Sequence, residues 1–324
     1  MSPKILIVTL VAACMANVVH AGGGLSVAHR VFAEQTAITH ISLAYPATGL
    51  AGIDNDIRSI VVDKAKEFRS LAQGDYLKGE GVYTDDAHYE IARNDSEAFA
   101  VVWNEEADFH GAHPSHEIFT AEYLLPDGWR IYLPEIVDGE RGLKLVSALA
   151  MADLDRQLLG PDGLSDKDWI ARGTAPTAPN FENFILQRDR LRIEFPPYQV
   201  AAYAAGPQSV EIPLAKLRPA IRPNWRAPQA SFDCSHARAE IEKMICSDAR
   251  LARLDRQVAE TYFEHLGWIK DGSVGTSADA LRGEQRAWLA KRATACNGKT
   301  GSALLACLST FYGTRLDALV SVTQ

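Results

Sequence analysis

The segment SFDCSHARAEIEKMICSDAR, residues 231–250, begins the last third of the 324-residue chain and decides how that third folds. This third holds four cysteines, Cys234, Cys246, Cys296 and Cys307. No other cysteine lies between Cys14 and Cys234. Apolar residues recur at intervals of three and four through most of the segment, which is the spacing of one helical face. The pattern predicts a small all-α domain over residues 231–324, stapled by two disulfides.

Four cysteines allow three pairings. Cys296 and Cys307 flank a turn expected between antiparallel helices, so they can approach each other. Cys234 and Cys246 would lie roughly 18 Å apart on one straight helix, which is too far for a disulfide. A helix that begins near Glu240, after a returning loop, removes that obstacle. We favour Cys234–Cys246 and Cys296–Cys307. The alternative of a metal site is disfavoured because no paired C-x-x-C is present.

The preceding part of the chain predicts a second domain of α+β class over residues 38–217. A helix with one buried stripe begins at Ile53, and a second helix is expected over residues 143–159. Strands are expected near residues 41–45, 89–92, 98–103, 122–125, 129–133, 184–186, 191–195 and 210–214. This order lacks regular βαβ alternation, so it predicts a mainly antiparallel sheet with helices. Three prolines predict a semi-rigid linker over residues 218–230.

The first 21 residues have the pattern of an export signal, with Lys4 before an apolar run and small residues around Ala21. Residues 22–37 are then expected to be a flexible lead-in. Val11-Ala12-Ala13-Cys14 also resembles a lipoprotein cleavage box, so an anchor at Cys14 is the alternative. No later apolar run is long enough to span a membrane. We expect the protein to be periplasmic or secreted, because disulfides persist in those compartments.

The charge of the chain points to a basic partner. The formal net charge of −8 argues against nucleic acid. Residues 231–324 hold 12 Lys and Arg against 11 Asp and Glu, a net charge of +1. Residues 22–230 hold 20 against 30, a net charge of −10. Long-range attraction of a basic protein is therefore expected mainly from the N-terminal domain.

The last third resembles the LprI-type lysozyme inhibitor domain. The shared residues are, in order, Phe232-Asp233-Cys234, Ile245-Cys246, Leu254-Asp255, Leu281-Arg282, Gln285-Arg286, Trp288-Leu289, Arg292, Cys296 and Cys307. Ala239-Glu240 departs from the family, whose members often have Thr-Pro before the second cysteine's helix. The resemblance implies lysozyme binding, with Trp288 and Arg292 as candidate binding residues. The alternative is that these residues only build the scaffold.

The N-terminal domain resembles the RsiV/PdaC-type extracellular domain. Gly111-Ala112-His113-Pro114 matches a family signature, and Phe195–Val200 with Tyr203–Pro207 matches its closing motif. This resemblance implies a second lysozyme-binding domain. The candidate binding residues are His110, His113, Pro114, Tyr198 and Tyr203. Signalling across a membrane is not implied, because no transmembrane or sigma-binding segment is expected here.

His110, His113 and His116 are spaced like metal ligands, but Gly111 and Pro114 disfavour the helix that would align them. We expect an exposed loop and no metal or other cofactor.

The sequence also has no nucleophile elbow, H-E-x-x-H or Walker loop. The acidic pairs Asp85-Asp86 and Glu105-Glu106 are expected on the solvated surface. We therefore expect a non-enzymatic, stoichiometric inhibitor of a c-type lysozyme or related muramidase. The alternatives are a protein that binds peptidoglycan fragments without inhibition and, third, a metal-dependent hydrolase.

Overall fold

The computed structural model describes residues 23–75, 81–160, 164–222, 225–226, 230–271 and 277–320. The expected export signal and Cys14 lie outside these residues. The chain forms two compact units, the first ending at Arg222 and the second beginning at Pro223.

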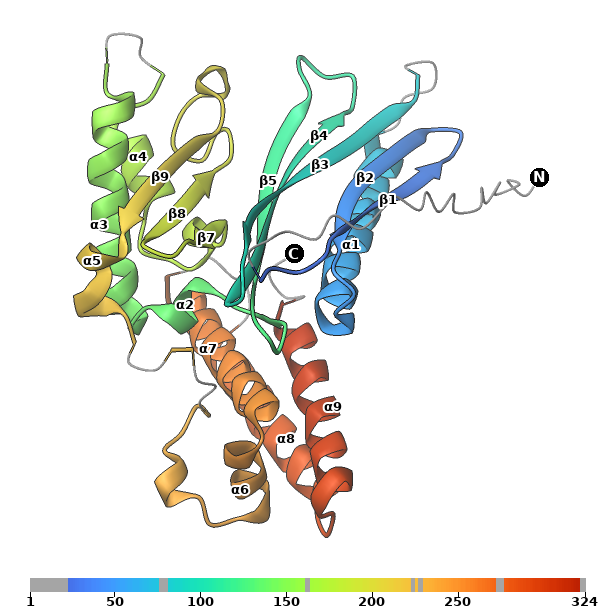
Figure 1. The fold of residues 1–324 in the computed structure, drawn as a ribbon, viewed down its shortest axis with the longest axis vertical. Coiled ribbons are helices and arrows are strands. Elements are labelled where there is room, and N and C mark those ends of the chain that lie inside the picture. Colours follow the sequence, from blue (N-terminus) through green and yellow to red (C-terminus); the bar gives the residue numbers. More distant parts are fainter. Residues whose placement is uncertain are drawn as a thin grey trace. The chain divides into compact units, whose positions relative to one another are not determined.

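The first unit is built on a six-stranded sheet whose strands follow the order of the chain (Figure 1). The strands are β1 (Ala28–Gln35), β2 (Thr39–Ala47), β3 (Tyr83–Asn94), β4 (Ala98–Asp108), β5 (Ser115–Leu124) and β6 (Trp129–Arg130). All neighbouring pairs are antiparallel except β2 and β3. A parallel pair needs a crossover connection, and α1 (Ala51–Asp75) supplies it.

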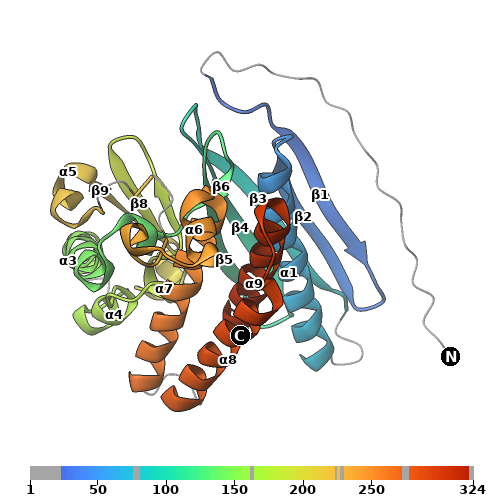
Figure 2. The same ribbon diagram turned by 90° about the horizontal axis from the view of Figure 1, so that it is seen from below.

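Helix α1 lies along one face of this sheet (Figures 1 and 2). Its buried stripe recurs every three or four residues and consists of Ile53, Ile57, Val61, Ala65, Phe68 and Ala72. Trp103 packs with the first residues of this stripe, and Ile41 and Leu43 pack in a second cluster with those that follow from Val61 onward. The helix predicted from Ile53 is therefore confirmed, and burial of one stripe fixes the face that it turns to the sheet.

A second, three-stranded antiparallel sheet completes the first unit. It consists of β7 (Phe184–Leu186), β8 (Arg190–Phe195) and β9 (Gln208–Pro213). The accompanying helices are α2 (Leu133–Ile136), α3 (Gly139–Leu158), α4 (Lys167–Gly173) and α5 (Leu214–Leu217), with 3-10 helices at Pro179–Phe181, Tyr203–Ala205 and Arg218–Ala220. The Thr120 hydroxyl accepts the Phe184 amide at 3.1 Å and so joins β5 to the start of β7.

Two expectations for the ends of this unit are wrong. Ala28–Gln35, inside the expected flexible lead-in, pairs along its whole length with β2. Its residues are mostly exposed at the edge of the sheet, so no burial period marks the strand in the sequence. The expected linker also begins too early, because Arg218–Ala220 is helical and Ile221 pairs with Val137. Pro223 and Pro228 lie outside the described residues.

The second unit is all-α, as predicted. Its helices are α6 (Glu240–Ser247), α7 (Ala249–Asp271), α8 (Ala278–Cys296) and α9 (Gly301–Val320). The Asp248 carboxylate accepts the Leu251 amide at 2.8 Å, and the Ser277 hydroxyl accepts the Ala280 amide at 3.1 Å. Both contacts satisfy amides that the first helical turn leaves free. In the described ranges, no helix is long and apolar enough to cross a membrane.

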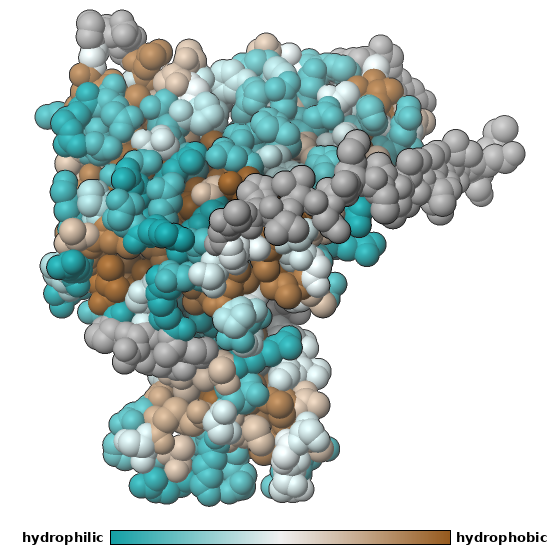
Figure 3. Space-filling view, in the orientation of Figure 1, coloured by the Kyte–Doolittle hydropathy of each residue, from teal (hydrophilic) through white to brown (hydrophobic). Residues whose placement is uncertain are grey.

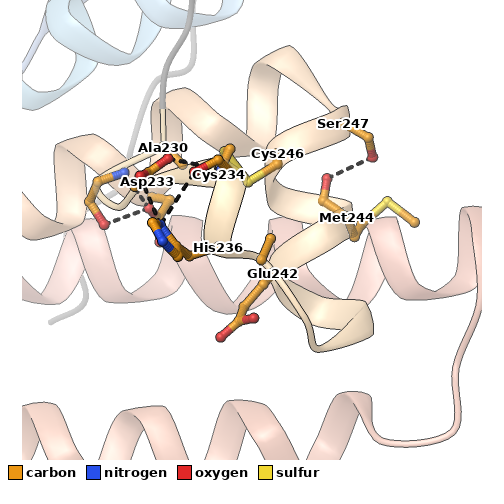
Figure 4. Close-up of a disulfide and its surroundings, with 12 residues drawn as sticks. Ala230, Asp233, Cys234, His236, Glu242, Met244, Cys246 and Ser247 are labelled. Carbon is orange, nitrogen blue, oxygen red and sulfur yellow. Dashed lines mark hydrogen bonds and ion pairs between the residues drawn. A yellow bond between two sulfur atoms is a disulfide. The ribbon is translucent and has the colours of Figure 1, made fainter.

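The disulfides are Cys234–Cys246 and Cys296–Cys307, which confirms the favoured pairing. Cys234 lies on the 3-10 turn Cys234–His236, and the chain returns before α6 carries Cys246 to it (Figure 4). The predicted class, a mainly antiparallel α+β part followed by a disulfide-stapled helical part, is confirmed.

Candidate functional site

Four rings from two distant segments meet in the first unit. His113 lies between β4 and β5 and His116 lies on β5, whereas Tyr198 and Tyr203 lie between β8 and β9. The His113 ring stacks on Tyr203 with centroids 3.8 Å apart, and Tyr198 lies 5.6 Å from Tyr203. The His116 ring lies 5.6 Å from the Tyr203 ring. We call His113, His116, Tyr198 and Tyr203 the aromatic cluster.

Hydrogen bonds hold the rings of the aromatic cluster in place. The Tyr203 hydroxyl donates to the Pro114 carbonyl at 3.0 Å. The same carbonyl lies 2.8 Å from His113 Nδ1, and a carbonyl only accepts, so Nδ1 carries a hydrogen. In the neutral imidazole Nε2 is then an acceptor, and it receives the Tyr198 hydroxyl at 3.1 Å. Pro114 therefore belongs to the site through its backbone oxygen.

Tyr198 is presented to solvent in a constrained conformation. Its φ is +71°, in the left-handed region that a residue with a side chain rarely adopts. The Tyr198 amide donates to the Ala201 carbonyl at 3.1 Å, and the Tyr198 carbonyl accepts the Trp169 indole N–H at 2.9 Å. The side chain is nonetheless 55% exposed. A rigid, exposed tyrosine is the kind of group that anchors protein interfaces.

A carboxylate lies beside the aromatic cluster. Glu106 lies 3.6 Å from His116 and pairs in register with it across β4 and β5. Partial desolvation, followed by the negative charge of Glu106, raises the pKa of Tyr203. The negative charge of Glu106 suits a cationic partner surface.

His110 lies apart from the aromatic cluster. Its ring packs on Tyr83 at 5.4 Å, and its amide donates to Asp108 at 2.7 Å. Its φ of +57° places its backbone in the left-handed region. Within the described part of the chain, no three His, Cys, Asp or Glu side chains are placed to hold a metal ion together.

In the second unit, Trp288 and Arg292 are tied into the packing of the helices. The Trp288 indole donates to the Phe311 carbonyl at 3.2 Å, and its ring meets Tyr312 edge to face at 5.2 Å. The Arg292 guanidinium lies over both rings and donates to the Tyr312 hydroxyl. Both side chains are partly buried, and the neighbouring Leu289 is exposed.

This network continues to the start of the unit. The Tyr312 hydroxyl donates to Asp255 at 2.5 Å, and the other oxygen of Asp255 accepts the amide and hydroxyl of Ser231 at 2.7 and 2.6 Å. Burial, followed by Asp255, raises the pKa of Tyr312. Sequence reasoning included Asp255 in the family pattern but missed Tyr312. The one signal for Tyr312 was its helical spacing from the apolar residues of the same segment. The network supports the scaffold alternative for these residues.

The expectation that both acidic pairs lie on the solvated surface is wrong for one member of each pair. Successive residues of a strand point to opposite faces. Asp86 and Glu106 are exposed, whereas Asp85 is 0% and Glu105 7% exposed on the other face. In β3 the alternation of Tyr83, Asp85 and Ala87 with polar residues was the sequence signal that could have placed Asp85 on the buried face. In β4, residues 98–103 are buried on both faces, and the sequence gives no such signal.

Comparisons with known proteins divide the chain in the same way. Residues 234–319 match the family model described as "Lysozyme inhibitor LprI". Residues 136–215 match one described as "Protein of unknown function (DUF3298)". The match to the first family supports a lysozyme-inhibitor role in general terms.

The DUF3298 region is also similar to the peptidoglycan-N-acetylmuramic acid deacetylase PdaC of Bacillus subtilis, with 27% identity over 138 residues. The match covers 42% of this chain and 29% of PdaC, so the chain spans less than a third of that relative's length. These matches confirm the two resemblances expected from the sequence.

Two solved structures of DUF3298 family proteins are similar to the chain. One, from Pseudomonas aeruginosa, is 12% identical with a TM-score of 0.49 and covers 62% of this chain and 96% of its own. The other, from Bacteroides fragilis, is 18% identical with a TM-score of 0.44 and covers 64% and 96%.

Proposed function

We propose that this protein binds a c-type lysozyme or a related muramidase and inhibits it by stoichiometric occlusion, without chemistry of its own. The observation that carries the proposal is the match of residues 234–319 to the lysozyme inhibitor family. The two disulfides of that unit suit an oxidising compartment. We therefore also propose a periplasmic or secreted location, with an anchor at Cys14 as the alternative.

In this proposal the aromatic cluster is the contact surface of the first unit. Exposed tyrosines that are already ordered lose little conformational entropy on binding, which is why they dominate interface energetics. The cluster presents Tyr198 in this way and lies beside Glu106. C-type lysozymes are basic, so the net charge of −10 over residues 22–230 favours their approach. Hydrophilic residues cover most of the first unit's face in Figure 3.

A second candidate function is the binding of peptidoglycan without inhibition. It is favoured by the similarity of the DUF3298 region to PdaC, whose name states that it acts on peptidoglycan N-acetylmuramic acid. Here the first unit would bind cell-wall fragments and the second unit would act as a structural domain.

A lysozyme titration separates the two functions. The protein from Gly22 onward is mixed with a c-type lysozyme at low and moderate salt, and both complex formation and cell-wall lysis are measured. Saturable inhibition near one-to-one that survives moderate salt supports the inhibitor. Full lysis at excess protein, together with retention on insoluble peptidoglycan, would replace it with the second candidate.

A further inference from the structure

A pocket with an acidic rim lies between α1 and the neighbouring ends of β4 and β5, in the first unit. We call it the acidic pocket. Its lining residues are Lys64, Glu67, Phe68, Leu71, Glu105, Ala107, Phe109, Ser115 and Glu117. It lies on the α1 face of the sheet, whereas Glu106 and His116 point to the opposite face. It is therefore separate from the aromatic cluster.

The acidic pocket contains a buried carboxylate whose hydrogen-bonding capacity is incompletely used. The Glu105 side chain is 7% exposed, and its Oε2 has no hydrogen-bond partner among the described residues. Lys64 Nζ lies 3.4 Å from that oxygen as an ion pair, but the hydrogen bond of Lys64 goes to Glu117. A buried carboxylate oxygen that has an ion pair but no hydrogen bond is costly to keep.

Negative charge exceeds positive charge in this region. Among the described residues lining the acidic pocket, Lys64 is the one cation, and it faces Glu67, Glu105 and Glu117. Behind them, burial and then the charge of Glu105 raise the pKa of Asp85 to about 8. Burial would lower the pKa of Lys64, but the surrounding carboxylates outweigh burial and raise it. A further cation would relieve this imbalance.

The walls of the acidic pocket are apolar and aromatic. Phe68 and Phe109 meet with centroids 4.9 Å apart, and Leu71 remains 50% exposed at the rim. Such walls suit the methylene stem of a long cationic side chain. Glu105 and Glu117 lie opposite each other across β4 and β5, and a guanidinium can donate to two carboxylates at once and stack on aromatic rings.

We propose that the acidic pocket binds an arginine side chain of a basic partner protein. The identification of that partner as a lysozyme rests on the function proposed above. Arginine fits better than lysine because its planar fork can engage Glu105 and Glu117 together, while Lys64 already supplies one ammonium.

The first test needs no lysozyme. N-acetyl-arginine amide and N-acetyl-lysine amide are titrated into the protein, and amide NMR shifts of residues 105 and 117 are followed. We expect a saturable shift with the arginine compound and at least about tenfold weaker binding of the lysine compound. Glu117→Gln, which is at an exposed position and so should not disturb folding, is expected to weaken arginine binding at least about tenfold. Glu140→Gln, on the exposed surface of α3, is the matched control and should bind as the wild type does.

The second test uses lysozyme and the variants Glu117→Gln and Glu105→Gln. Both are expected to bind it at least about tenfold more weakly than Glu140→Gln does. Glu105→Gln should keep or raise the thermal midpoint, because it removes one buried charge while Lys64 keeps Glu67 and Glu117 as ion-pair partners. Loss of binding caused by unfolding would instead lower the midpoint.

The outcomes for the pocket and for the proposed function are distinguishable. If the arginine compound shows no saturable shift, or shifts Glu117→Gln as it shifts wild type, the pocket proposal is overturned, even if lysozyme is inhibited. If arginine binds as expected but lysozyme does not bind, the pocket stands and the lysozyme function is overturned. Equal preference for the lysine compound would reject the arginine assignment.

Discussion

At the scale of single residues, strand alternation gives neighbouring carboxylates different environments. Asp85 and Asp86 are adjacent, yet the first is buried toward α1 and the second is exposed. The same holds for Glu105 and Glu106. Burial makes the charged form of a carboxylate unfavourable, so Asp85 keeps its proton in the folded protein at pH values at which it loses it in the unfolded chain.

This difference predicts the pH dependence of stability. The pKa of Asp85 is raised to about 8 in the folded state, so between its unfolded pKa of about 4 and pH 8 the unfolded chain binds fewer protons. Stability therefore falls as pH rises through this window. Asp85→Asn has no proton to lose, and we expect it to gain on the order of 2 kcal/mol relative to wild type between pH 5 and pH 9. Urea unfolding across this range measures it. Parallel pH profiles for wild type and Asp85→Asn would contradict the assignment, and Asp86→Asn is the control.

Tyr198 carries the second prediction at this scale. Tyr198→Ala should weaken lysozyme binding by about 10- to 100-fold, as loss of an exposed aromatic anchor does, without lowering the thermal midpoint. His110→Asn, in the same loop as His113 but outside the aromatic cluster, should bind normally, because asparagine tolerates the left-handed backbone found there. Calorimetric titration measures both. Equal affinities for the two variants would show that the cluster is not the contact surface.

At the scale of elements, the second unit is held together by disulfides at two places with different burial. Cys296 is 1% exposed and packs in the core with Leu304 and Leu308, whereas Cys234 is exposed. The two loops have sequence separations of 11 and 12, so their entropic contributions should be nearly equal. Any difference between them then reflects packing.

We therefore expect the double variant Cys296→Ala/Cys307→Ala to lose more stability than Cys234→Ala/Cys246→Ala. Each should lose about 3 kcal/mol from loop entropy, and the first should lose roughly 1 kcal/mol more from the core. Urea unfolding followed by circular dichroism measures both. A larger loss for Cys234→Ala/Cys246→Ala would mean that the stability of the unit depends more on fixing the 3-10 turn than on packing of the core.

At the scale of the whole molecule, charge is divided between the two parts of the chain. Residues 22–230 carry −10 and residues 231–324 carry +1. Exposed charges act over about 10 Å at 0.1 M salt and steer encounter more than they hold the complex.

Raising salt should therefore slow the association of the full-length protein with a basic lysozyme. Between about 50 and 500 mM salt we expect the association rate constant to fall about tenfold or more and the dissociation rate constant to change little. Surface plasmon resonance separates the two. A salt effect confined to dissociation would show that the charges lie inside the interface instead of steering from a distance.

Local patterns in the sequence were sufficient for much of this protein: the stripe of α1, the four helices of the second unit, the disulfide pairing and the class of both parts. Each depends on contacts between residues close in the chain, which periodicity and short separations report directly. Only the tertiary structure brought Tyr198 onto His113, 85 residues away, and placed Tyr312 between Arg292 and Asp255. It also decided which member of each acidic pair is buried, and that β1 is a strand. These features depend on which strand faces and which layers meet. Packing between segments far apart in the chain decides that, and the local sequence of one segment does not show which other segment it will contact.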